Sequence, residues 1–202
     1  MSTTTLPHGQ PTARSGAARK ITDLLEPKNW ILLDVIVIGL AVDGLPGLGW
    51  GMLGALFAAV LPIWFIKRGI RNERWADRHV GAKQHRLIVM TFIIVSVAVG
   101  ITLLVLLGAP RPITALIVSM LTTLAALMAV TPAWKVSVHS AVSSGSVLLI
   151  ALACGWWALI LSPLVALVGW SRVALRDHTR NQVIAGALVG AFAAAATYIP
   201  LR

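Results

Sequence analysis

Apolar and polar positions alternate along the chain in long blocks. Residues 1–28 are polar and contain proline and glycine, which predicts a flexible tail. Residues 29–202 contain apolar runs at 30–46, 48–66, 87–108, 112–131, 138–155, 156–170 and 183–200. Helices of such lengths suit the hydrocarbon layer of a bilayer, which is about 30 Å thick, at about 1.5 Å per residue. The pattern predicts an all-α polytopic transmembrane bundle of about six or seven spans that forms a single domain.

Residues that favour turns separate the apolar runs. The segment 108–112, Gly-Ala-Pro-Arg-Pro, is a clear turn, and Gly155 predicts a tight reversal between two short runs. The first run differs from the others because it holds Asp34 and ends at residues 43–46, Asp-Gly-Leu-Pro. We expect the first two runs to form either two spans or one shallow hairpin.

The composition is typical of a membrane protein, and it bears on which partners the positive net charge indicates. The chain is 57% hydrophobic and 12% charged, and its mean hydropathy is +0.84. A soluble domain of this size needs more polar surface. The net charge of +10 could indicate nucleic acid. Because the basic residues lie in short connections between apolar runs, we expect membrane lipids and no nucleic acid as partners. The single cysteine, Cys154, excludes an internal disulfide.

The order of the runs predicts which polar segments share one side of the membrane. If each run crosses once, the tail lies on the same side as residues 67–86, 132–139 and 170–182. This side holds all of the 17 Lys and Arg residues except Arg111 and Arg202. By the positive-inside rule, we expect a multi-pass protein of the cell membrane whose basic face is cytoplasmic.

One of these polar segments places a histidine beside an arginine at the end of an apolar run. Ionisable groups are costly at membrane level, so they indicate a functional site. Arg172 precedes His178 by six residues, and arginine offers a planar fork of donors that suits phosphate oxygens. Gln182 follows His178 by one helical turn and could fix the tautomer of the imidazole. The alternative is that the arginines are ordinary interfacial residues.

A second segment, Lys135-Val-Ser137-Val-His139, opens another apolar helix. The free N–H groups and the positive dipole end of a helix N-terminus favour an anion, and Ser137 adds a hydroxyl. The alternative is a helix cap beside an interfacial histidine. A third segment, residues 67–86, is strongly basic and is either a solvated loop on anionic headgroups or a phosphate clamp.

These segments resemble the signature motifs of the type 2 phosphatidic acid phosphatase superfamily of membrane lipid phosphatases. The superfamily is related in fold to bacterial acid phosphatases and vanadium haloperoxidases. Its third motif, S-R-x5-H-x3-D, is similar to Ser171, Arg172 and His178 here, with Gln182 in place of the aspartate. The resemblance covers about residues 67–190 and is most specific at this motif.

The other two motifs match less closely. The second, P-S-G-H, is similar to residues 136–139, which keep Ser137 and His139 and have Val138 in place of glycine. The first, K-x6-R-P, is similar to Lys67 and Arg74 with tryptophan in place of proline. A loop so rich in cations also satisfies this spacing by chance.

The resemblance implies a mechanism with two histidines. His178 would attack phosphorus and form a phosphohistidine, while His139 would protonate the leaving oxygen and then activate water. Gln182 or Asp177 would orient the nucleophile, and neither a metal nor another cofactor is implied. The groups that would bind the phosphate are Arg172, Ser137, the N–H of Val138, Lys135, Lys67 and Arg74.

The departures from the motifs leave two functions open. Gln182 supplies no charge and Val138 narrows access to the phosphate, so turnover would be slow. The first function is hydrolysis of a lipid phosphomonoester or diphosphate of phosphatidate or isoprenoid type, and the basic loop favours isoprenoid diphosphates. The second is a catalytically degenerate protein that binds anionic lipid phosphates or a partner. A transporter fits less well because the polar residues gather at one membrane face. A homo-oligomer is compatible with either function.

Overall fold

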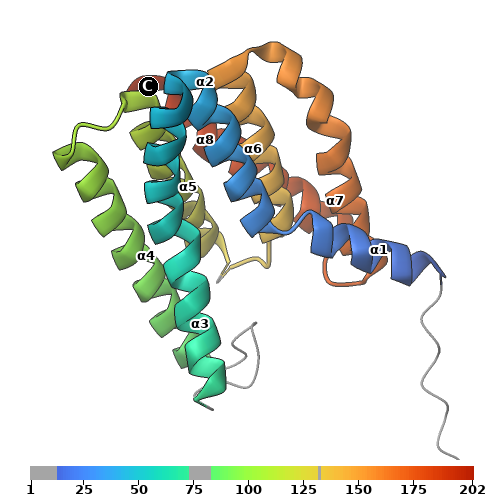
Figure 1. Cartoon of the computed structure of the whole chain (residues 1–202). Helices are drawn as coiled ribbons and strands as arrows, with labels where there is room; N and C mark the ends of the chain where they lie inside the picture. The colour runs from blue at the N-terminus through green and yellow to red at the C-terminus, as the bar shows by residue number, and fades with distance from the viewer. Residues whose placement is uncertain (1–12, 73–82, 132) are drawn as a thin grey trace, which may run out of the picture.

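The computed structural model describes residues 13–72, 83–131 and 133–202, and every regular element in these ranges is helical. The elements are α1 (Ala13–Leu24), α2 (Pro27–Ala55), the π-helical turn η1 (Leu56–Val60), α3 (Leu61–Arg71), α4 (Lys83–Leu106), α5 (Arg111–Val130), α6 (Val138–Cys154), the 3-10 helix η2 (Trp156–Leu161), α7 (Ser162–Ala174) and α8 (Arg180–Leu201). The long helices run side by side in one bundle, and α1 lies across its lower end (Figure 1). The all-α prediction is confirmed.

Several of these helices are suited to a lipid environment. Four helical segments of the described residues are long and apolar enough to cross a membrane: residues 15–71, 111–130, 156–174 and 180–201. Two shorter apolar helices cover residues 91–106 and 138–154. Large apolar side chains also point away from the bundle, for example Phe192 and Leu188, which are 77% and 67% exposed. An outer surface of this kind is expected of helices that face lipid.

The segment 15–71 is not one straight rod. The backbone leaves the helical region at Asp43 and at Gly44, whose positive φ of 61° favours glycine. A Cβ atom on Gly39 would lie 2.8 Å from the carbonyl oxygen of Gly47. The two halves of α2 therefore fold back on each other as an antiparallel hairpin, and Figure 1 shows the reversal at the upper end. The break predicted at residues 43–46 is confirmed.

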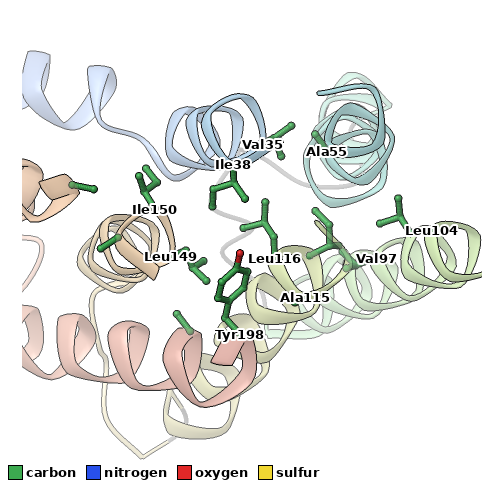
Figure 2. Packing of buried hydrophobic residues seen from close by; sticks show 14 residues of the cluster. Val35, Ile38, Ala55, Val97, Leu104, Ala115, Leu116, Leu149, Ile150 and Tyr198 are labelled. Atoms are coloured by element: carbon green, nitrogen blue, oxygen red, sulfur yellow. The ribbon is translucent and has the colours of Figure 1, made fainter. Parts of the chain in front are cut away.

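The closest packing in the bundle joins α6 to α8. A Cβ atom on Gly186 would lie 2.5 Å from the carbonyl oxygen of Ser137, and one on Gly190 would overlap the carbonyl group of Ala141. Small residues allow this approach of two backbones, which is a common basis of helix association in membranes. Farther along α8, Tyr198 is buried near Leu149, and Figure 2 shows both side chains in the apolar core.

The N-terminal helix differs from its prediction. Residues 1–28 were expected to be a flexible tail, yet residues 13–24 form α1, which packs on α7. Ala18 is fully buried, and the hydroxyl groups of Thr22 and Ser171 lie 3.0 Å apart. These contacts explain why this part of the polar segment is helical. Residues 1–12 lie outside the described ranges.

Candidate functional site

The site lies at the lower end of the bundle, where the beginnings of α6 and α8 meet the end of α7 (Figure 1). The N–H of Ser137, just before α6, donates to the carbonyl oxygen of Gln182 in the first turn of α8 (3.2 Å). Gly186, one turn farther along α8, permits this contact because it has no side chain. The two motif segments, about forty residues apart in sequence, are therefore held together by their backbones.

A tight turn between α7 and α8 folds His178 back over the end of α7. The carbonyl oxygen of Arg172 accepts from the N–H groups of Asp177 (3.1 Å) and His178 (3.3 Å). Arg176 adopts the left-handed conformation (φ 60°), which such helix ends usually assign to glycine or asparagine. This turn brings Arg172 and His178, which are six residues apart in sequence, into one compact unit.

Arg172 is the main cation of this unit. Its terminal nitrogen pairs with the carboxylate of Asp177 at 2.9 Å, and the Arg172 side chain is only 13% exposed. Its Nε is buried and has no hydrogen-bond partner among the residues that the structure describes. A buried donor without a partner is costly, so this nitrogen is a natural position for an anionic oxygen.

The hydrogen bonds of Gln182 determine the tautomer of His178. The side-chain oxygen of Gln182 accepts from the N–H of Thr179 (3.1 Å) and lies 3.3 Å from Nδ1 of His178. Because an amide oxygen can only accept, this network assigns the imidazole proton to Nδ1. Nε2 then carries the free lone pair that a nucleophile needs. The predicted contact between Gln182 and His178 is confirmed, and the same glutamine completes a capping box with Thr179.

The surroundings of His178 favour its neutral form. Burial lowers the pKa of His178 below its usual 6.5, and the positive charges of Arg172 and Lys135 lower it further. The hydrogen bond that His178 donates to Gln182 and the charge of Asp177 act in the opposite direction but are weaker. The imidazole is therefore uncharged at neutral pH, as nucleophilic attack requires.

His139 lies in the first turn of α6, and the charges of Arg172, His178, Asp177 and Glu26 all act on it. The helix begins at Val138, so the N–H groups of its first turn have no acceptor four residues earlier within the helix. An anion bound here would meet these N–H groups, the arginine and both imidazoles. The contribution of Glu26 was missed from the sequence, because it comes from the connection between α1 and α2.

The structure brings together most, but not all, of the predicted site residues. Lys135 joins the cluster, since its Nζ donates to the carbonyl oxygen of Asp177 (3.3 Å). Lys67 does not: it lies on α3, which packs chiefly on η1 and α4. Arg74 lies outside the described residues. Val138 flanks the site with a side chain that is 43% exposed.

Two predicted roles need correction. Ser137 was expected to donate to the phosphate, but it is fully buried and its hydroxyl oxygen accepts from the N–H (3.3 Å) and hydroxyl (3.0 Å) of Ser140 as the N-cap of α6. Asp177 was considered as an orienting group for His178. Its carboxylate instead pairs with Arg172, because the left-handed turn at Arg176 directs it towards α7.

A comparison of the chain with protein-family models, curated proteins and solved structures finds no match. The functional argument therefore depends on the residues of the site.

Proposed function

We propose that the chain is a membrane-embedded lipid phosphatase that works through a phosphohistidine intermediate. The observation that carries the proposal is the buried Nε of Arg172, which has no partner among the described residues and whose guanidinium charge acts on both His139 and His178. The resemblance of the sequence to the phosphatidic acid phosphatase motifs supports the same chemistry. Phosphate binding satisfies the open donor of Arg172, and the neutral His178 supplies the nucleophile.

The reaction has two steps. In the first, Nε2 of His178 attacks phosphorus, the bond from phosphorus to the lipid oxygen breaks, and that oxygen takes a proton from His139, whose protonation the negative charge of the bound phosphate favours. In the second, neutral His139 takes a proton from water, the resulting hydroxide attacks phosphohistidine, and inorganic phosphate leaves with Nε2 restored. Arg172 and the N–H groups at the start of α6 stabilise the charge on the phosphoryl oxygens in both steps.

An apolar groove beside the site favours a lipid substrate. A cavity of about 760 Å³ lies between α6, α7 and α8, with Ile184, Leu188 and Val173 along it and Arg180 at its rim. A two-chain amphiphile of phosphatidate type can leave one of its chains in this groove while its headgroup reaches the histidines. Because Lys67 lies elsewhere, the described residues support one bound phosphate group, of phosphatidate type, better than the diphosphate suggested by the basic loop.

The position of the site is also part of the proposal. The cluster, α1 and the C-terminal end of α3 lie at the same end of the bundle (Figure 1), and this end carries most of the basic residues. The positive-inside rule places it in the cytoplasm. Labelling of a cysteine introduced as Arg176→Cys in closed inside-out vesicles, with Cys154→Ser as background, tests this orientation. Labelling only after the vesicles are opened would overturn it.

Phosphate release from purified protein tests the chemistry. We expect release from phosphatidate or dodecyl phosphate, inhibition by vanadate, and at least about a thousandfold loss of rate in His178→Ala and in His139→Ala. Arg176→Asn is the matched control, because asparagine tolerates the left-handed conformation and Arg176 lies on the same turn. Wild-type rates in both histidine variants would exclude the proposal.

A second function is favoured by one observation, the neutral Gln182 beside His178. A carboxylate there would stabilise the positive charge that develops on the imidazole, and an amide cannot. A catalytically degenerate protein would bind dodecyl phosphate without releasing phosphate, and His178→Ala would change its affinity little.

A further inference from the structure

A buried acidic side chain, Asp34, lies inside the bundle, away from the histidines. Asp34 of α2 is 1% exposed, and its Oδ2 accepts from the hydroxyl of Ser146 on α6 at 2.7 Å. Its other oxygen, Oδ1, is buried and meets no hydrogen-bond partner within the described part of the chain. An acidic residue within an apolar helix is costly to keep, so an open oxygen there indicates a ligand more than a purely structural link.

Asp34 and Ser146 border a cavity of about 240 Å³ between α2, α4, α5 and α6. Most of its lining is apolar, as at Ile93 and Leu124, and the described residues of the lining include no Lys, Arg or His. The hydroxyl of Thr123 also borders the cavity but already donates to the carbonyl oxygen of Ser119 (2.9 Å). Asp34 is therefore the polar group that an occupant of this cavity would meet.

The cavity extends inward from the candidate site. Val138, the residue before His139, lines it, and so does Ser146 on the same helix. These two residues are separated by about 12 Å along the helix axis, at about 1.5 Å per residue. A lipid whose phosphate sits beside His139 can pass Val138 and follow α6 into the bundle. Its chain would then reach Asp34 at roughly that depth.

The size and the chemistry of the cavity limit the occupant. An apolar cavity of roughly 150 Å³ holds one benzene molecule, so this one has room for a segment of a single chain. A plain hydrocarbon leaves Oδ1 of Asp34 unsatisfied. A hydroxyl group satisfies it whether the carboxyl is ionised or protonated, because a hydroxyl both donates and accepts.

We propose that this cavity selects lipid phosphates whose chain carries a hydroxyl group about 12 Å from phosphorus, with Asp34 and Ser146 as the recognising pair. The inference rests on the proposed function and adds the class of substrate. It makes Asp34 a specificity residue that takes no part in bond breaking.

The test uses two alkyl phosphates of equal length, dodecyl phosphate and its derivative with a hydroxyl at about carbon 8, which an extended chain places roughly 12 Å from phosphorus. We expect wild-type protein to prefer the hydroxylated compound by about tenfold in kcat/KM, as one hydrogen bond to a buried group allows. Asp34→Leu should abolish the preference and keep the rate on dodecyl phosphate. Ser146→Ala, a smaller change, should reduce the preference. Ser119→Ala removes a buried hydroxyl outside the cavity and should leave the preference unchanged.

The outcomes separate this inference from the proposed function. The inference is overturned if wild-type protein, Asp34→Leu and Ser146→Ala all show the same preference for the hydroxylated compound. Hydrolysis of dodecyl phosphate would still support a phosphatase. If no phosphate is released from either compound, the proposed function fails. The inference is then decided by the dissociation constants of the two compounds for His178→Ala protein and for the Asp34 and Ser146 variants. Equal affinities throughout would show that the Asp34–Ser146 pair only links two helices.

Discussion

The corner formed by α6, α7 and α8 and the region around α3 are held together in different ways. In the corner, Gly186 and Gly190 bring two backbones into contact, and a hydrogen bond from Ser137 to Gln182 fixes their relative position. The α3 region is held by side chains, as in the stacked rings of Phe65 and Phe92, whose centroids lie 4.0 Å apart. Aromatic rings tolerate sliding, whereas backbone contact does not.

This difference explains why the segments around His139 and His178 meet and why Lys67 does not join them. Catalytic groups need placement within about 0.5 Å, which rigid backbone contact provides. His139, Arg172 and His178 all lie within a few residues of the contact between α6 and α8 or of the turn that leads into it. Lys67 lies on a helix that continues beyond η1, away from that contact.

The largest effect should come from an added side-chain atom that forces α6 and α8 apart. Gly190→Ala places a methyl group on the carbonyl of Ala141, so the helices must separate. We expect a cost of about 1–3 kcal/mol in stability and loss of most phosphate release, because the two histidines move apart. Thermal unfolding in detergent and the phosphate assay measure the two effects. Gly49→Ala, where the added atom meets nothing within 4 Å, is the control and should be neutral or stabilising.

The next effect tests whether the corner binds phosphate through the geometry of Arg172. Arg172→Lys keeps the charge but loses the fork that reaches both Asp177 and an anion. We expect kcat/KM to fall by about a hundredfold, as when one donor to the transition state is removed. Arg176→Lys makes the same exchange on the exposed turn and should change the rate less than about twofold. Wild-type rates in both variants would mean that only the charge of Arg172 matters and not the geometry of its fork.

The sequence predicted the features that local patterns encode and missed those that depend on tertiary packing. The apolar runs predicted the helices and the reversal near Asp43, because burial and turn residues are local signals. The contact between His178 and Gln182 was predicted from a helical spacing, but it forms because His178 lies just before α8 and Gln182 turns back in the capping box with Thr179. The packing of α1 on α7 was missed, because its polar composition resembles a tail and a single buried alanine leaves no pattern. The left-handed Arg176 was missed as well, since the usual marker, glycine, is absent.

A smaller effect is a shift of the pH profile of kcat/KM, and its direction differs between two variants. The reaction needs neutral His178, whose pKa is lowered below 6.5 by burial, Arg172 and Lys135. The acid limb of kcat/KM should therefore lie below pH 6.5. Lys135→Gln removes a charge that lowers this pKa, so the limb should move to higher pH. Asp177→Asn removes a charge that raises it, so the limb should move to lower pH. Shifts in the same direction for both variants would show that another group titrates.

The smallest effect is expected at Lys67, and it decides how the basic loop is to be interpreted. Lys67→Gln should change hydrolysis of dodecyl phosphate by less than about twofold, because an exposed cation outside the site contributes little. Lys135→Gln makes the same change of charge within the cluster and should cost more, since Lys135 reaches the turn that carries Asp177. A farnesyl diphosphate assay extends the comparison. If Lys67→Gln lowers that rate by tenfold or more and spares dodecyl phosphate, the α3 region binds the second phosphate. The corner and the α3 region would then bind different phosphate groups of the same substrate.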